Sequence, residues 1–232
     1  MIITSERSGE PGESGQETWA AVDDYFYRAL FAGDGTMAEA ERAGEAAGLP
    51  AISVSAAQGK LLHLLVRGLK ARRILEVGTL GGHSTLWMAK AITTPGRLIT
   101  LELDPRHAEV ARTNLDRAGV GELVDIRVGP AAESLPALLD ERPEPFDFVF
   151  IDADKASNSV YLNYAVLLGR PGTVIVIDNV VRGGRVLTSA DDSSAGVRHL
   201  VDTLAARTDI DSAAIQTVGA RGYDGFILAV VR

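Results

Sequence analysis

Acidic and amide side chains follow two apolar runs of this sequence, at the points where buried strands are expected to end. Asp152-Ala153-Asp154-Lys155 follows residues 146–151, and Asp178-Asn179 follows residues 173–177. Because the carboxyl ends of neighbouring parallel strands meet at one edge of a sheet, we expect these side chains to lie together. Carboxylate and amide oxygens suit a hard divalent cation, and Lys155 places a proton acceptor beside it. The pattern is typical of a metal-assisted active site.

A glycine-rich turn follows an earlier expected strand. The segment Glu76-Val77-Gly78-Thr79-Leu80-Gly81-Gly82-His83-Ser84 leads from that strand into a helix. Glycines let the backbone approach a ligand closely, and the first turn of a helix offers unpaired amides. Glu102 ends the next expected strand, 24 residues after Gly78, where an acid binds ribose hydroxyls in such folds. Each signal alone also fits a tight turn or a solvated acid, but together they favour a nucleotide-type cofactor site.

The elements that must position these residues alternate regularly along the chain. Helical spacing of apolar residues predicts helices from residue 16, over 36–47 and from 55, before the first strand. Near-continuous Val, Ile and Leu in the strands indicates a sheet covered on both faces, and strand–helix alternation requires parallel crossovers. The short connection at 221–225 implies an antiparallel final hairpin. We therefore expect a doubly wound, Rossmann-like α/β fold with strands at 73–77, 98–103, 124–128, 146–152, 173–178, 213–218 and 226–231.

Length and composition bound the class of protein. With 232 residues and 46% hydrophobic content, residues 16–232 are expected to form one domain, preceded by a disordered tail at residues 1–15. That tail lacks the apolar core of a signal peptide or membrane span. The net charge of -8 disfavours a nucleic-acid partner, and the absence of cysteine fits a cytoplasmic protein.

These motifs resemble the cation-dependent, S-adenosylmethionine-dependent O-methyltransferases, a family that includes catechol and caffeoyl-coenzyme A O-methyltransferases. The resemblance covers nearly all of residues 19–232 and rests on the segments 76–84, 101–104, 151–155 and 177–180. It implies a seven-stranded methyltransferase sheet, a homodimer, and methyl transfer to one hydroxyl of a vicinal dihydroxy aromatic. In the mammalian catechol enzymes a substrate-binding acid lies near the C-terminus, and residues 219–226 offer no clear counterpart.

The resemblance also implies roles for individual residues. Glu102 would hold the ribose, and Ala131 would meet the adenine through its backbone alone. Magnesium is the first choice of cation, with manganese or calcium as alternatives, and Lys155 would either accept the hydroxyl proton or stabilise the phenolate. The implied cofactor-binding residues are Val54, Glu76, Gly78, Thr79, Leu80, Ser84, Glu102, Ala131 and Asp152; the implied metal ligands are Asp152, Asp178 and Asn179; and the implied catalytic residues are Lys155 and Asp152.

Other interpretations remain at this stage. A nicotinamide-dependent oxidoreductase would use the same turn but expects glycine at Leu80, and a non-catalytic S-adenosylmethionine-binding protein would not need the metal set. Taken singly, the acids fit helix caps and Lys155 fits a solvated helix face.

The four histidines lack zinc-ligand spacing. Residues 182–185 could clamp an anionic substrate tail or form a solvated loop, and Trp19, Tyr25 and Phe26 could wall a pocket, pack in the core or form a dimer face.

Overall fold

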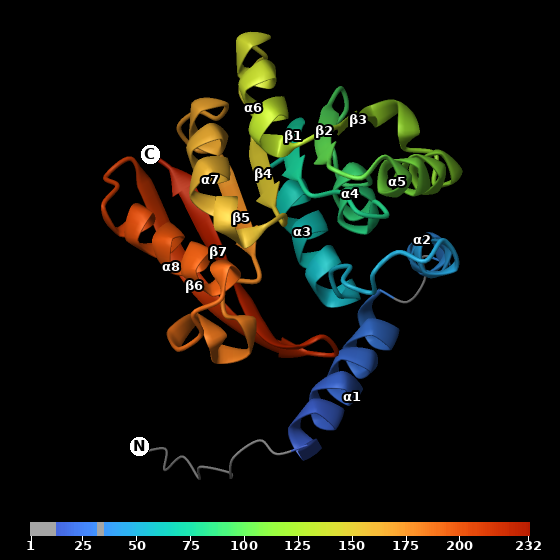
Figure 1. Ribbon diagram of the computed structural model, residues 1–232. Coiled ribbons are helices and arrows are strands. Elements are labelled where there is room, and N and C mark those ends of the chain that lie inside the picture. The colour runs from blue at the N-terminus through green and yellow to red at the C-terminus, as the bar shows by residue number, and fades with distance from the viewer. Residues whose placement is uncertain (1–12, 32–34) are drawn as a thin grey trace, which may run out of the picture.

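The computed structural model describes residues 13–31 and 35–232. Figure 1 shows a central sheet flanked by helices, with one long N-terminal helix standing at the edge of this body. Three helices precede the sheet: α1 (Glu13–Leu30), α2 (Gly35–Ala46) and α3 (Ala56–Gly68). Of the tail predicted at 1–15, residues 1–12 lie outside the described residues, and α1 begins at Glu13. None of the helices in the described ranges combines the length and apolarity that a bilayer span requires.

The sheet confirms the predicted fold class. Its strands run in the order β3-β2-β1-β4-β5-β7-β6, with β7 antiparallel to both β5 and β6 and the other pairings parallel. The strands are β1 (Arg73–Val77), β2 (Arg97–Glu102), β3 (Val124–Val128), β4 (Phe148–Ile151), β5 (Val174–Asp178), β6 (Ile210–Gly219) and β7 (Gly222–Val231). The connecting helices are α4 (His83–Ala89), α5 (Pro105–Arg117), α6 (Ala131–Asp140), α7 (Asn158–Leu167) and α8 (Asp192–Ala205), with short 3₁₀ helices η1 (Gly121–Leu123), η2 (Lys155–Ser157) and η3 (Arg182–Leu187).

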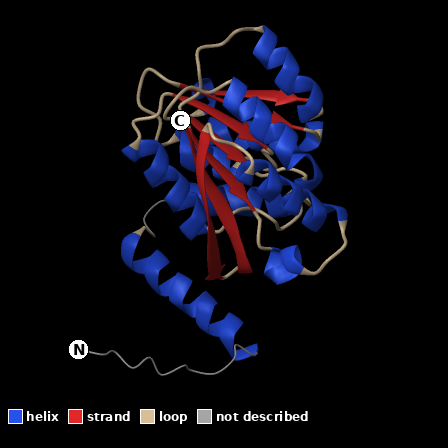
Figure 2. Cartoon of the chain, turned by 90° about the vertical axis from the view of Figure 1, so that its left-hand side faces the viewer, coloured by secondary structure: helices blue, strands red, loops and turns tan. Residues whose placement is uncertain are grey.

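Both faces of the sheet are buried, as the unbroken apolar strands predicted. Successive side chains of a strand point to opposite faces, so Phe148 and Phe150 of β4 pack with α3, α4 and α5, whereas Val149 and Ile151 pack with α6, α7 and α8. All four are fully buried. Figure 2 shows helices on either side of the red strands. Burying one such side chain stabilises the fold by about 1.5–3 kcal/mol.

Strand β4 begins two residues later than the sequence predicted. Phe146 and Asp147 precede the strand, and the Asp147 carboxylate accepts the backbone amides of Arg72 and Arg73 at 2.8 and 3.0 Å. Asp147 therefore binds the start of the neighbouring strand β1. It interrupts the segment 146–152, which the sequence suggested was a single strand. The strand ends at Ile151, one residue before the predicted 152, and Asp152 follows it directly.

The final hairpin is antiparallel as predicted, but its turn lies elsewhere. The register pairs Gly219 with Gly222, so the loop is only Ala220-Arg221 and the predicted connection 221–225 belongs largely to β7. Turn-forming residues stand inside this strand because they meet other parts of the fold. The Asp224 carboxylate accepts the amides of the loop after β5, and a Cβ at Gly225 would lie 2.3 Å from the Ile215 carbonyl oxygen.

Helix α1 forms as predicted, but its apolar face stays outside the core. Tyr25 and Leu30 are 66% and 71% exposed, and Val22 and Phe26 are also exposed. The helix is fixed instead to the tip of the β6–β7 hairpin, where Asp23 accepts the Ala220 amide at 2.7 Å. Figure 1 shows α1 reaching this tip beyond the helical layers. Of the alternatives left open by the sequence, core packing does not apply to Tyr25 and Phe26 in the chain taken alone, and a dimer face remains.

Gly196 of α8 provides a test of how tightly the helical layer packs. A Cβ at this position would lie 2.2 Å from the Lys155 carbonyl oxygen and 2.7 Å from the Ala156 Cα. Gly196→Ala should therefore lower the free energy of unfolding by about 1–3 kcal/mol, the usual cost of overpacking, as measured by urea denaturation. Gly68→Ala is the matched control, because nothing lies within 4 Å of its Cβ position in α3. The control should be neutral or slightly stabilising, and equal stability of the two variants would contradict the packing described.

Candidate active site

A cavity of about 870 Å³ opens at the carboxyl edge of the parallel strands. Residues that follow β1, β2, β4 and β5 contribute to its wall, as the topology requires. The structure brings nearly all of the predicted site residues together in this one cavity. Those that line it are Val54, Gly78, Thr79, Leu80, Ser84, Glu102, Ala131, Asp152, Lys155, Asp178 and Asn179.

The glycine-rich turn after β1 lies directly against the end of β4. Gly78 has a φ of 101°, and a Cβ there would lie 2.3 Å from the Asp152 carbonyl oxygen. The Asp152 amide in turn donates to the Val77 carbonyl oxygen at 2.8 Å. Only glycine accommodates both this positive φ and this backbone contact. The turn and the acidic end of β4 therefore form a single wall of the cavity.

Glu102 holds the same turn from the other side. Its Oε2 accepts the backbone amides of Thr79 and Leu80 at 3.1 and 2.7 Å, and its Oε1 accepts the Asp104 amide at 3.0 Å. His107 Nδ1 lies 3.3 Å from Glu102 Oε1, and His107 also lines the cavity. Sequence reasoning missed this histidine. The signal was present in the Asp104-Pro105 helix start, since a side chain in the first turn points back toward the preceding strand end.

Glu76 is the one predicted site residue that does not line the cavity. Its carboxylate lies fully buried beneath the turn and accepts hydroxyl hydrogen bonds from Ser84, Thr85 and Thr100 at 2.6, 2.5 and 2.7 Å. Burial raises the pKa of Glu76 to about 7, against the lowering effect of these hydroxyls. Ser84 lies between this carboxyl group and the cavity, so Glu76 supports the wall rather than forming its surface.

The acidic half of the cavity contains a close lysine–aspartate pair. Lys155 Nζ donates to Asp152 Oδ1 at 2.8 Å, and the lysine is only 7% exposed. The structure thus rules out the solvated helix face for Lys155. Asp154 does not compete for this lysine, because its carboxylate caps η2 through the Ser157 amide and accepts the Tyr161 hydroxyl.

Asp178 and Asn179 complete this half from the end of β5. Asp178 is 3% exposed, and burial together with the charge of Asp152 raises the pKa of its carboxyl group above the usual range. Asn179 has a φ of 55°, a left-handed conformation that asparagine tolerates better than most residues, and it turns the chain sharply after Asp178. Within the described residues no three His, Cys, Asp or Glu side chains gather as a metal site, so the candidate donors are two acids and one amide.

The sheet order and the glycine turn held by an acid at the end of β2 define a methyltransferase fold. The O-methyltransferase family model matches residues 33–229, and the chain belongs to this family. The chain is 50% identical to a catechol O-methyltransferase of Mycobacterium tuberculosis over 212 residues, covering 91% of this chain and 95% of that protein. It is 47% identical to a catechol O-methyltransferase of Niastella koreensis, covering 93% and 99%.

Solved structures agree with this assignment. An O-methyltransferase from Bacillus cereus in complex with SAH superposes with a TM-score of 0.92 at 49% identity, covering 94% of this chain and all of that one. The O-methyltransferase TomG from Streptomyces achromogenes, in complex with SAM, gives a TM-score of 0.90 at 47% identity and covers 93% and 98%. The protein is therefore an O-methyltransferase, and the oxidoreductase and non-catalytic interpretations of the turn are set aside.

Proposed function

We propose that this enzyme transfers the methyl group of S-adenosylmethionine to one hydroxyl of a vicinal dihydroxy aromatic, with the help of a divalent cation. The observation that carries this proposal is the single cavity, which joins the turn held by Glu102 to the acidic set around Asp152. A methyl donor and an acceptor hydroxyl must meet within one enclosure for an in-line displacement. The names of the two bacterial relatives, both catechol O-methyltransferases, support the same substrate class.

The cofactor would occupy the half of the cavity built by β1 and β2. Gly78 leaves its backbone open to a ligand, and Glu102 presents a buried carboxylate to which ribose hydroxyls can donate. Val54 and Ser84 would lie near the methionine end. Ala131 begins α6, whose first turn offers backbone amides on the adenine side. The SAH and SAM bound to the related structures support this cofactor.

The donors of the other half fit a hard cation. Asp152 and Asp178 supply carboxylates, Asn179 supplies an amide oxygen, and all three line the cavity. Two nearby acids, one of them buried, are balanced by only one lysine, so a cation here would offset their repulsion. Magnesium is the first choice, and manganese or calcium would also accept oxygen donors. When bound, the cation would lower the pKa of the substrate hydroxyls and orient them.

Lys155 is the residue we assign to the proton of the reacting hydroxyl. Its ammonium group is held by Asp152 within the cavity, and its backbone lies against Gly196 of α8. A lysine fixed in this way can accept the proton or hold the phenolate by its charge. Both roles need Nζ at the acceptor oxygen, and the ion pair with Asp152 limits where Nζ can lie.

We further infer that the enzyme is a homodimer. The exposed apolar face of α1, formed by Val22, Tyr25, Phe26 and Leu30, is a contiguous stripe of the kind that interfaces bury. A second copy of the chain would cover it.

Two substitutions should separate cofactor binding from chemistry. Glu102→Gln keeps the size of the side chain but removes its charge, and we expect it to weaken S-adenosylmethionine binding by about 1–3 kcal/mol. Asp178→Asn should leave cofactor affinity close to that of the wild type and lose cation-dependent turnover of catechol. Calorimetry measures the first property, and methyl transfer with and without chelator measures the second. Full turnover in excess chelator, or equal cofactor affinity in the two variants, would contradict the proposal.

Removal of Lys155 tests its role in proton transfer. Lys155→Ala should reduce kcat on catechol by roughly 10²- to 10⁴-fold, the range for a positioned acid–base group. If Lys155 is the base, the deficit should shrink on a nitrocatechol, whose more acidic hydroxyl needs less help to ionise. A deficit of equal size on both substrates would instead assign Lys155 to stabilising the phenolate. A variant as active as the wild type on both would exclude either role.

A further inference from the structure

Three lysine or arginine side chains line the cavity, and two of them are neutralised within the fold. Lys155 pairs with Asp152 at 2.8 Å. Arg221 pairs with Glu41 at 2.9 Å and donates to the Ala51 carbonyl oxygen at 3.0 Å, which ties the hairpin tip to α2 and to the loop after it. These two charges therefore already have partners.

Arg182 is the exception. Among the described residues its guanidinium makes no ion pair, and its Nε is buried without a hydrogen-bond partner. Its position is nevertheless fixed, because its backbone amide donates to Asp224 Oδ1 at 2.8 Å and its φ is 58°. A non-glycine residue is held in this left-handed conformation only where the surroundings require it. The fold thus places a partly buried guanidinium, with its Nε unpartnered and no ion pair among the described residues, at a defined point of the cavity wall.

The nearby acids are committed to other groups. Asp224 Oδ1 accepts the amides of Val181, Arg182 and Gly225, which fix the loop after β5. Asp191 caps α8 through the Ser194 amide and accepts the Ser189 hydroxyl; these hydrogen bonds, and to a smaller extent the charge of Arg182, lower the pKa of its carboxyl group. Neither carboxylate bonds to the guanidinium. Because a buried donor left without an acceptor is costly, a ligand that supplies one would be favoured.

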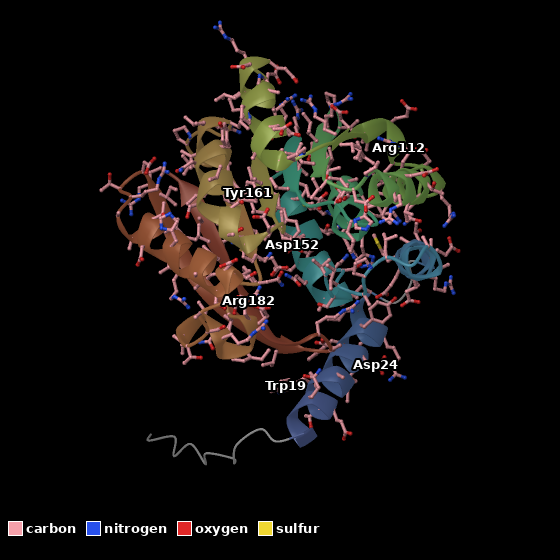
Figure 3. All side chains as sticks on the ribbon, viewed as in Figure 1. Trp19, Asp24, Arg112, Asp152, Tyr161 and Arg182 are labelled. Atoms are coloured by element: carbon pink, nitrogen blue, oxygen red, sulfur yellow. The ribbon has the colours of Figure 1, made fainter. Side chains whose placement is uncertain are left out.

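Arg182 also lines the same cavities as the candidate metal ligand Asn179. It comes three residues after Asn179, and these two residues take part in both the main cavity and an adjoining hollow of about 430 Å³. Arg185 and Tyr223 also line this hollow. Figure 3 labels Arg182 and Asp152, which both line the main cavity. A substrate whose diol lies at Asn179 would extend its other end past Arg182.

We propose that Arg182 binds a carboxylate on the aromatic substrate, so that the preferred substrates are catechols with an acidic side chain, such as dihydroxybenzoates and dihydroxycinnamates. A planar guanidinium matches a carboxylate and would satisfy the buried Nε with a charge-assisted hydrogen bond. The substrate acid would neutralise the one cation of the cavity wall that the fold leaves unpaired. This inference rests on the proposed function, because it assumes that a catechol occupies the acidic half of the cavity.

The test compares two substrates that differ in charge and hardly in shape. 3,4-Dihydroxybenzoate and 3,4-dihydroxybenzamide are each assayed for kcat/KM, and their affinities for the enzyme are measured by calorimetry. The wild type should prefer the acid. Arg182→Gln should lower the acid-to-amide ratio of kcat/KM by about 10- to 100-fold, mainly through KM, as loss of a charged hydrogen-bond partner implies. Arg182→Glu should reverse the preference toward 3,4-dihydroxybenzylamine.

Arg142→Gln is the matched control. Arg142 is also an arginine with positive φ, at 51°, but it is exposed at the end of α6 and does not line either cavity. Its substitution should leave the acid-to-amide ratio unchanged. An equal preference of the wild type for acid and amide, or an Arg182→Gln variant with an unaltered ratio, would overturn the inference. If the wild type methylates neither compound, the proposed function fails, and the calorimetric comparison of acid with amide still decides whether Arg182 binds a carboxylate.

Discussion

The contact between Gly78 and the backbone of Asp152 is the constraint on which the rest of the site depends. The parallel pairing of β1 with β4 brings the two strand ends together, and the missing side chain of Gly78 lets the turn close against the Asp152 carbonyl oxygen. The turn that would receive the cofactor and the acid that would bind the cation thus share one wall. In the proposed function, this backbone geometry would bring the methyl donor close to its acceptor before any side chain contributes.

Electrostatic balance explains the arrangement of side chains around this contact. Glu76 is buried with three hydroxyl partners and Glu102 with three backbone amides, so the acids beneath and beside the turn are satisfied by the protein itself. In contrast, Asp152 and Asp178 share a single lysine, which leaves negative charge for a cation. Arg182, in contrast, carries a positive charge whose buried Nε has no hydrogen-bond partner. Asp152, Asp178 and Arg182, whose charges are not fully balanced by partners in the described part of the chain, all line the cavity, as expected of a binding site.

The positions of the main acidic residues could be predicted from the sequence, because each lies at or just after the carboxyl end of a buried strand. Parallel strands that are buried on both faces read as unbroken apolar runs, so Asp152, Asp178 and Glu102 could be placed at one edge without coordinates. What failed depended on contacts between distant segments. Asp224 and Gly225 are residue types typical of a turn, but they lie in β7. There Asp224 accepts a backbone amide of the loop after β5, and Gly225 leaves room for the backbone of β6. Glu76 lies buried below the turn because of its side-chain direction, which motif spacing does not encode. His107 reaches Glu102 from the first turn of α5, and only the helix start at Asp104-Pro105 indicated it.

The central claim is that Asp152, Asp178 and Asn179 hold a divalent cation next to the cofactor turn. The most direct measurement is anomalous scattering from crystals of the enzyme grown with manganese, S-adenosylhomocysteine and a nitrocatechol. The account predicts one manganese peak within about 2.0–2.6 Å of oxygens from all three side chains, with both catechol oxygens completing its coordination. A peak at any other place in the cavity, or none at saturating manganese while the catechol is bound, would contradict it.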